Sequence, residues 1–305
     1  MKTADDIFAL PATDRPRPRD GSIADTWSNT RGWLALARDW GAILLIAAAS
    51  RRVGGAAAYA AAVALIGAFQ FALGEALIHE ASHYHLFRTR SWNDRFEFLY
   101  ALPFFMTVAQ FREEHLAHHR DVGTPDDALL ADYRRAGLFR PRLNAFWIWF
   151  LKPLTGFPAW FYLTKLSLTP WRCGAKIVGF WTLVTLLAAR LGALKLLALY
   201  WLVPLWTAHV AFLYWSEIQD HFATHSGTRS VTGRLGNWLW HNNGLHAAHH
   251  ARAGVAWFRL PEAHRDFAAS GAPLDLSSGF LDTYRQLRAA ALRHPQGVPA
   301  PRRGD

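Results

Sequence analysis

Cysteine is nearly absent from this chain: Cys173 is the only one among 305 residues. A single cysteine excludes a disulfide framework and any zinc or iron–sulfur site built from several thiolates. The sequence also has no glycine-rich phosphate loop, no RNA-binding signature and no zinc-finger spacing, so it gives no indication of a nucleic-acid partner. If this protein binds a metal, other side chains must provide the ligands.

Long apolar runs are abundant, since 51% of the residues are hydrophobic, which argues against disorder. The run from Val53 to Gly74 has no charged residue across 22 positions, which is enough to span a bilayer. Leu196 to Ser216 is a second such run, and two weaker ones carry charges only near their ends. The sequence therefore predicts an all-α integral membrane protein with four transmembrane helices in two hairpins, at about 33–50, 53–78, 173–190 and 194–216. A soluble protein with apolar core helices is the competing interpretation.

The charge distribution favours the membrane interpretation. The chain has 33 Lys and Arg against 23 Asp and Glu, a net charge of +10. The two short connectors would hold only Arg51, Arg52, Arg190 and Lys195, which leaves 29 basic residues on the other side. Because basic residues concentrate on the cytoplasmic side, both termini are predicted to be cytoplasmic. The 28 Arg against 5 Lys indicate a high-GC bacterial gene, and hence a bacterial cytoplasmic membrane.

The predicted topology divides the chain into three regions: a polar N-terminal segment (1–32), a membrane domain (33–290) and a flexible tail (291–305). Within the membrane domain, a cytoplasmic insert (80–172) and a cytoplasmic C-terminal region (217–290) would form a helical cap.

Two pieces of the insert are apolar or aromatic, Phe96 to Phe111 and Asn144 to Leu163. Prolines and a lysine interrupt them, so they are predicted to be interfacial helices rather than spans. Trp147, Trp149 and Trp160 are then expected at headgroup depth.

Three histidine clusters stand out among the fifteen histidines. His79 to His83 reads His-Glu-Ala-Ser-His, and both His115 to His119 and His246 to His250 read His-x-x-His-His. On a helix, residues three or four apart share one face, so each cluster can present its rings to one metal site. The predicted topology places all three clusters on the cytoplasmic side. A lone histidine near a helix end is usually a surface or packed residue, but this repetition indicates metal binding.

Eight imidazoles are more than one metal ion can use, so the sequence predicts two metals. Neutral imidazole suits iron, copper, nickel and zinc, and the sequence supports iron only indirectly. His221, just past the fourth predicted span, is a ninth candidate. Glu217 lies one helical turn before it, so both can face the same site.

These clusters, together with the stretch from Ala248 to His264, resemble the membrane-bound fatty acid desaturase family over roughly residues 40–270. The resemblance implies an all-α membrane domain with a cytoplasmic cap and a non-haem diiron centre. It also implies that dioxygen and two electrons, from an external ferredoxin or cytochrome b5-type donor, are used to desaturate a fatty acyl chain. The implied iron ligands are His79, His83, His115, His118, His119, His246, His249 and His250, with His221 as the additional ligand after the last span.

Several carboxylates accompany these histidines. In some relatives, an Asn that holds a water on one iron occupies the position of Glu217, and a carboxylate there would either bind iron directly or steady a ligand or a water. Carboxylates often orient a ligand imidazole from outside the metal site. Glu80, Asp121 and Asp220 are the candidates for that role.

The remaining histidines near the clusters are expected to be supporting or surface residues. His85, His225 and His241 belong to this class. His209, in the middle of the fourth predicted span, is expected to be packed and hydrogen-bonded to a neighbouring helix.

Three other functions remain open at this stage. A hydroxylase or ketolase would use the same iron site on a lipid or hydrocarbon, and no residue of the clusters separates it from a desaturase. A membrane zinc protease would use the His-Glu-x-x-His sequence, with Glu80 as general base, but would leave the other two clusters unexplained. A metal transporter or scaffold would need ligands in the middle of the spans, where only His209 lies.

Overall fold

The structure is a computed structural model, which describes residues 27–299. Most of the predicted N-terminal segment and the last six residues of the predicted tail lie outside the described residues. The described part is mainly helical, with loops between the helices. One exception is a pair of three-residue strands, β1 (Arg229–Val231) and β2 (Asp275–Ser277), which pair in parallel and which the sequence did not predict.

Four helices are long and apolar enough to cross a membrane, as predicted. The first is α2 (Asn29–Val53), and the third is α9 (Trp171–Arg190). The second and fourth are continuous helices with π-helical segments inside them. The second comprises α3 (Gly55–Phe71), η1 (Ala72–Leu77) and α4 (Ile78–Ser82); the fourth comprises α10 (Leu194–Leu197), η6 (Ala198–Leu202), η7 (Leu205–His209) and α11 (Val210–His221).

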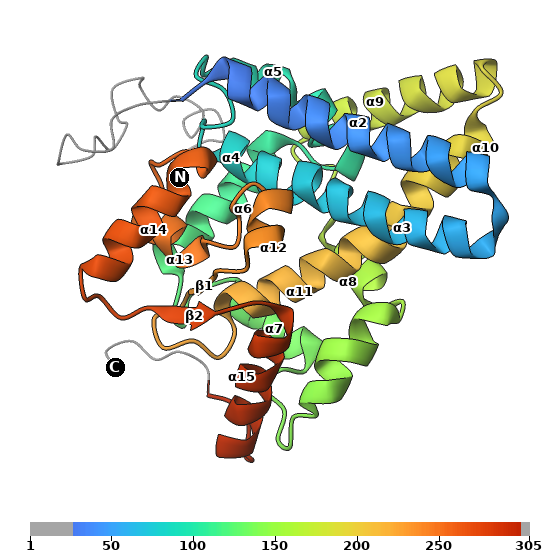
Figure 1. Ribbon diagram of the computed structural model, residues 1–305. Coiled ribbons are helices and arrows are strands. Elements are labelled where there is room, and N and C mark those ends of the chain that lie inside the picture. The colour runs from blue at the N-terminus through green and yellow to red at the C-terminus, as the bar shows by residue number, and fades with distance from the viewer. Residues whose placement is uncertain (1–26, 300–305) are drawn as a thin grey trace.

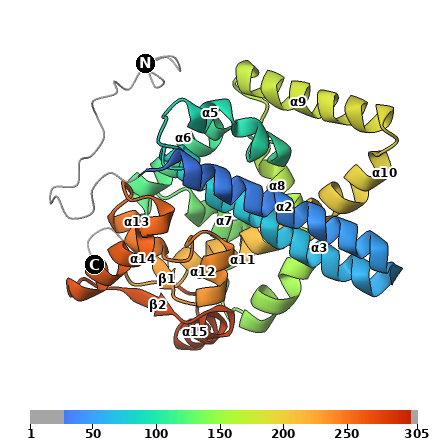
Figure 2. The same ribbon diagram turned by 45° about the horizontal axis from the view of Figure 1, so that its top comes forward.

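The first two long helices lie side by side along their length (Figure 1). A tight turn at Gly54 and Gly55 joins them, with φ of 74° and 81°. Residues with a side chain rarely adopt a positive φ, so glycine suits both positions. The other two long helices differ, because α9 contacts α10 close to their connecting turn and packs mainly against η3 (Leu102–Phe104). Figure 2 shows α9 diverging from the last long helix.

The second and fourth long helices approach each other very closely. A side chain at Gly67 would place its Cβ 2.3 Å from the Cβ of Ala208. Small residues at such crossings allow helix backbones to pack closely. This contact brings α11 against α3, and thereby brings His221 toward the end of the helix that carries His79.

The remaining elements gather around the ends of these helices (Figure 1). The α6 helix is fixed at its start by a capping box between Thr107 and Gln110. The sheet of β1 and β2 leads into the segment that carries the third histidine cluster. These elements are α5 (Trp92–Arg95), η2 (Glu97–Leu99), η3, α6 (Val108–Asp121), α7 (Leu129–Ala136), η4 (Trp147–Leu151), η5 (Lys152–Leu154), α8 (Phe157–Lys165), α12 (Arg234–Leu239), α13 (His246–Ala251), η8 (Trp257–Arg259), α14 (Leu260–Ala269) and α15 (Phe280–Arg293).

Two features of the aromatic insert and the C-terminal end differ from expectation. Trp147 and Trp160 are exposed, but Trp149 is fully buried and packs against Phe280 at 4.8 Å between ring centroids. The side chain of Trp149 is therefore a core residue and not an interfacial one. At the C-terminal end, Val298 is buried in the same core, so the described part of the predicted tail packs on the fold.

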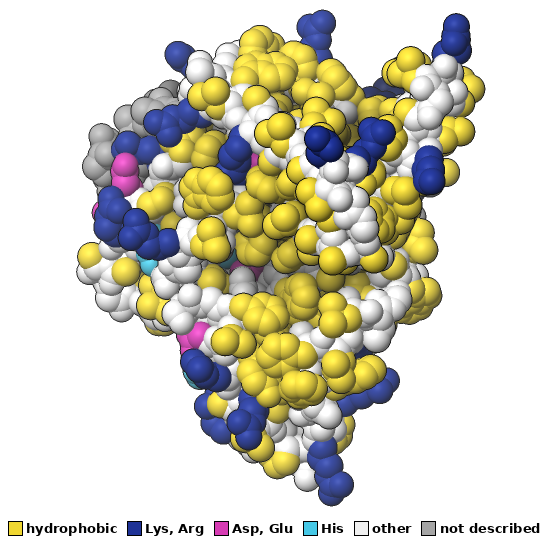
Figure 3. All heavy atoms as spheres, turned by 45° about the vertical axis from the view of Figure 1, so that its right-hand side comes forward, with side chains coloured by type: hydrophobic (Ala, Val, Ile, Leu, Met, Phe, Trp, Pro, Cys, Tyr) yellow, Lys and Arg dark blue, Asp and Glu magenta, His cyan; other side chains and the backbone are white. Residues whose placement is uncertain are grey.

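Hydrophobic side chains cover much of one face of the molecule, with Lys and Arg mostly at its edges (Figure 3). Exposed leucines are frequent on the long helices, including Leu44 and Leu45 on α2 and Leu183 and Leu186 on α9. An exposed apolar surface of this kind is typical of contact with lipid or with another protein.

Candidate metal centre

Nine histidines from four helices form two adjacent groups. One nitrogen from each member lies within 4.8 Å of the corresponding nitrogens of its group. The five-histidine group contains His79, His83, His115, His119 and His249, and the four-histidine group contains His118, His221, His246 and His250. All nine sequence-predicted ligands are thus brought together.

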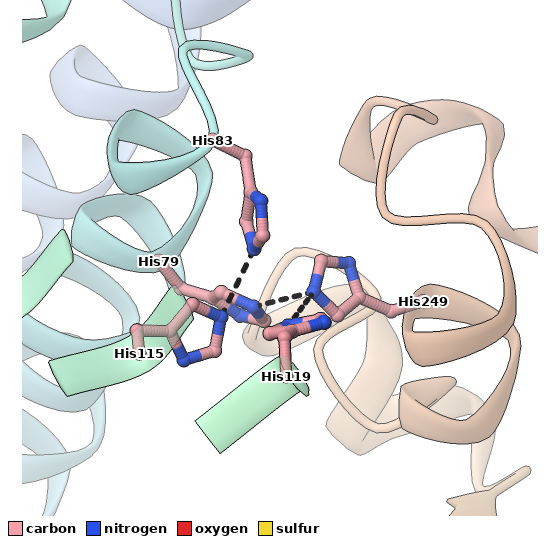
Figure 4. A group of neighbouring side chains, drawn as sticks. All are labelled: His79, His83, His115, His119 and His249. Carbon is pink, nitrogen blue, oxygen red and sulfur yellow. Dashed lines mark hydrogen bonds between the residues drawn. The ribbon is translucent and has the colours of Figure 1, made fainter. Parts of the chain in front are cut away.

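The rings of the five-histidine group point toward a common centre (Figure 4). The Nε2 atom of His249 lies 2.8 Å from Nε2 of His79 and 3.0 Å from Nε2 of His119. The Nε2 atoms of His83 and His115 are 3.0 Å apart. Five nitrogen donors therefore converge from α6, α13 and the C-terminal end of the second long helix.

The four-histidine group is similarly compact. Nε2 of His221 lies 3.2 Å from Nε2 of His118 and 2.9 Å from Nε2 of His246, which in turn lies 3.0 Å from Nε2 of His250. The rings of His119 and His250 stack at 4.0 Å across the boundary between the two groups. The two groups are therefore direct neighbours and can hold two metal ions close together.

Each His-x-x-His-His cluster is divided between the two groups. On α6, His115 and His119 belong to the five-histidine group, while His118 belongs to the other. Adjacent residues on a helix point about 100° apart, so His118 and His119 face different centres. The first cluster departs from a continuous helix, because α4 ends at Ser82 and His83 lies just beyond it.

Three of the histidines are oriented by hydrogen bonds on their outer nitrogen. Nδ1 of His118 lies 3.1 Å from Oδ1 of Asp127, and Nδ1 of His79 lies 3.1 Å from Oδ1 of Asn243. Nδ1 of His221 lies 3.0 Å from the carbonyl oxygen of Gly227. When Nδ1–H donates to these oxygens, the lone pair of Nε2 is left free for a metal.

Asp127 and Asn243 were not among the residues picked out from the sequence. Asp127 lies nine positions after His118, beyond the end of α6, and Asn243 is 164 positions from His79. No local spacing rule connects such pairs. In the sequence, the only indication of these two residues was that each is a polar residue in a loop close to a histidine cluster.

The environment favours the neutral form of several of the imidazoles. Burial, with repulsion from His79, His118 and His221, lowers the pKa of His119 to about 3. Burial and the neighbouring histidines also hold the pKa values of His115, His249 and His250 well below their usual range. Neutral imidazole is the form that binds a metal ion, so the lowered pKa values favour metal binding by these four rings.

The carboxylates predicted to support the ligands have other partners. Glu80 accepts a hydrogen bond from the backbone N–H of Trp257 at 3.1 Å. Asp220 accepts one from the Ser216 hydroxyl at 2.7 Å, and Asp121 pairs with Arg120. Among the described residues, none of these three is hydrogen-bonded to a histidine of either group.

Glu217 contributes no atom to either histidine group. Its carboxylate lies close enough to Lys165 to affect that ammonium: desolvation lowers the pKa of Lys165, but Glu217 and Asp132 outweigh it and raise the pKa above its usual value. Glu217 therefore has a cationic neighbour in α8, and it also interacts electrostatically with His118 of the four-histidine group.

The other histidines lie outside both groups. His85 stacks against His83, His225 is exposed, and His241 is hydrogen-bonded to Asp39 at 2.7 Å. His209 is fully buried beside Phe104, but neither ring nitrogen has a hydrogen-bond partner among the described residues. The predicted hydrogen bond of His209 to a neighbouring helix is therefore wrong, because apolar and aromatic side chains surround the ring.

The fold and the site together define a helical protein with four long apolar helices and two adjacent histidine groups. The family model for fatty acid desaturases matches residues 55–277, which include all nine histidines, and the chain belongs to the fatty acid desaturase family. It is similar to dihydrorhizobitoxine desaturase of Bradyrhizobium elkanii, with 27% identity over 238 residues that cover 68% of this chain and 67% of the relative.

Proposed function

We propose that the protein is an O2-dependent diiron desaturase that introduces a double bond into a fatty acyl or other lipid chain. Two electrons would come from an external ferredoxin or cytochrome b5-type donor. The observation that carries the proposal is the pair of adjacent histidine groups, with five and four converging nitrogens. Membership of the desaturase family supports the same reaction.

The donor set fits two iron ions. Five imidazoles leave one position of an octahedral ion open, and four leave two, so each site would retain room for an exogenous ligand. A diiron centre held there would supply the oxidising power to remove two hydrogens from adjacent carbons, with dioxygen, two electrons and two protons yielding two waters.

The protein side chains hold this donor set rigidly. His79 and His249 are almost fully buried, and the hydrogen bonds to Asp127, Asn243 and the Gly227 carbonyl fix ring orientation. Fixed ligands in a dry site limit side reactions of a strongly oxidising centre.

The four long apolar helices support a location in a membrane, where an alkyl substrate would be dissolved. The asymmetry of basic residues supports an orientation with the histidine groups on the cytoplasmic side, and the excess of Arg over Lys supports a bacterial cytoplasmic membrane. In this proposal the nine histidines hold the metal ions, and Glu80, Asp121, Asp220 and Glu217 are not assigned as ligands.

The contacts of Glu80 do not favour a zinc protease. Its carboxylate is occupied by the backbone N–H of Trp257, and His79 and His83 share their site with three further histidines. A protease of this class uses three protein ligands and leaves its glutamate facing the bound water.

The first experiment is mass spectrometry of total acyl chains from cells that express the wild type or His118→Ala, with a ferredoxin and its reductase supplied. We expect a product lighter by two hydrogens in the wild type alone, and its fragmentation would locate the double bond. A product heavier by one oxygen would identify a hydroxylase built on the same site instead. If no product depends on the wild-type protein, the proposal fails for acyl chains.

A further inference from the structure

Three aromatic rings form a continuous stack that begins at the five-histidine group. The rings of His83 and His85 lie 5.9 Å apart and within 20° of parallel. His85 stacks in turn on Trp27, at 5.2 Å and 11°. His85 is buried, whereas Trp27 is half-buried. The stack therefore leads from a member of the metal centre to a side chain that reaches the surface of the described structure.

A backbone turn of unusual conformation aligns the two histidines. Tyr84, between them, has a positive φ of 63°, which is unfavourable for a residue with a side chain. The guanidinium groups of Arg90 and Arg112 lie over its ring at 3.5 Å and 3.9 Å. These contacts hold Tyr84 in place and compensate for the strain. Maintained strain beside a functional site is commonly linked to function.

Basic side chains gather near Trp27. Asn29 exchanges two hydrogen bonds with Thr89, which fixes the start of α2 beside the turn at residues 88–90. Arg31 and Arg88 are exposed, and Arg90 is partly exposed. None of the three forms an ion pair with another residue in the part of the chain that the structure describes. Arg31 lies over the ring of Phe258 at 4.3 Å and Arg90 over that of Tyr84, contacts that leave their positive charge in place. Positive charge on a surface attracts an acidic partner and orients it on approach.

We propose that this face, made of Trp27, Arg31, Arg88 and Arg90, docks an acidic one-electron carrier protein, and that the stack of Trp27, His85 and His83 conducts its electrons inward. The proposal rests on the proposed function, which requires two electrons per turnover. Two successive carriers are each oxidised by one electron. The two electrons, two protons and the two substrate hydrogens reduce dioxygen to two waters. The rings themselves undergo no net change.

Binding tests the docking face independently of the reaction. The probe is an acidic [2Fe–2S] ferredoxin, titrated against the full chain in detergent, both as purified and after iron has been removed with a chelator. Arg31→Gln, Arg88→Gln and Arg90→Gln combined should weaken the affinity about tenfold at low salt, with a smaller difference at high salt. In the matched control, three exposed arginines of α15 are replaced by glutamine: Arg285, Arg288 and Arg293. This variant should bind ferredoxin with the wild-type affinity.

Electron transfer tests the stack. At a saturating concentration of reduced ferredoxin, the Trp27→Leu variant should oxidise ferredoxin about tenfold more slowly than the wild type does. The control variant Trp33→Leu should oxidise ferredoxin at nearly the wild-type rate. Trp33 lies in α2, six residues after Trp27, which precedes that helix. Among the described residues, its ring contacts Phe87, Trp92 and Phe96 but no histidine. With dithionite as reductant, the loss in Trp27→Leu should be much smaller than with ferredoxin.

The outcomes separate the two proposals. Equal ferredoxin affinities of the two triple variants would overturn the docking face, and equal rates for Trp27→Leu and Trp33→Leu would overturn the stack. A wild-type chain that binds ferredoxin on this face but neither holds iron nor modifies a lipid would contradict the proposed function and leave the docking face intact.

Discussion

His118 and Asp127 form a pair in which the imidazole Nδ1–H donates to the carboxylate Oδ1 across 3.1 Å, while Nε2 of the same ring faces the four-histidine group. Both side chains are buried. Burial raises the pKa of Asp127, but the hydrogen bond and the charge interaction with His118 outweigh it, so that the net pKa lies below its usual value. Asp127 therefore stays ionised, and it fixes the tautomer and the orientation of the His118 ring.

Removing this carboxylate should weaken one metal site selectively. Asp127→Ala is expected to reduce the iron affinity of the four-histidine group by about 10–100-fold, because His118 loses both its orientation and its charged partner. The loss of affinity is measured as the iron that each variant retains when it is incubated with a chelator, by elemental mass spectrometry. The neighbouring exposed Asp126→Asn is the control. Iron retention equal to that of the wild type in Asp127→Ala would show that the pair does not support a ligand.

The two groups should bind iron separately. His118→Ala and His249→Ala each remove one ligand from a different group, so each should lose roughly half of the bound iron and all of the activity. His264 and His294 lie outside both groups, so His264→Ala and His294→Ala should have mild effects on activity and bound iron. Turnover that persists in His118→Ala, or full iron content in both ligand variants, would contradict the assignment of the site.

Glu80 distinguishes the oxygenase from the protease chemistry. In Glu80→Gln, the amide oxygen can still accept the hydrogen bond from the N–H of Trp257, so we expect iron content and lipid modification to remain within about threefold of the wild type. Both are measured on the same preparation. Peptide cleavage with one bound zinc, abolished by Glu80→Gln, is the result that would refute the diiron assignment.

A buried ion network should contribute strongly to stability. Asp39 on α2 is fully buried and binds both Arg38, at 2.6 Å, and His241, at 2.7 Å. Asp39→Ala leaves Arg38 without its counterion and His241 without its hydrogen-bond partner, and it should cost about 3 kcal/mol of stability, since breaking a buried pair from one side is expensive.

Thermal unfolding in detergent measures this cost, and Asp94→Asn is the matched control. The pair of Asp94 with Arg112 is partly exposed, with 42% of the Asp94 side chain accessible, and should contribute less than about 1 kcal/mol. Equal melting temperatures for Asp39→Ala and Asp94→Asn would refute a stabilising role for the network.

The sequence was sufficient to predict the four long apolar helices and the residues that form the histidine groups. Both inferences depend on local patterns: runs of about twenty apolar residues reflect the thickness of a bilayer, and repeated spacings of three and four reflect the helical period. The π-helical segments η1, η6 and η7 could not be predicted in this way, since a run of apolar residues is equally compatible with an uninterrupted α-helix.

The division of the histidines into groups of five and four was decided only by the tertiary structure. Spacing shows that His115, His118 and His119 are close together, but not which centre each ring faces, because α6 lies between two centres supplied by α4, α11 and α13. The same limit applies to Asp127 and Asn243, whose hydrogen bonds to His118 and His79 depend on how distant loops fold over the helix ends. Local periodicity therefore determined which residues form the site, and long-range packing determined their partners.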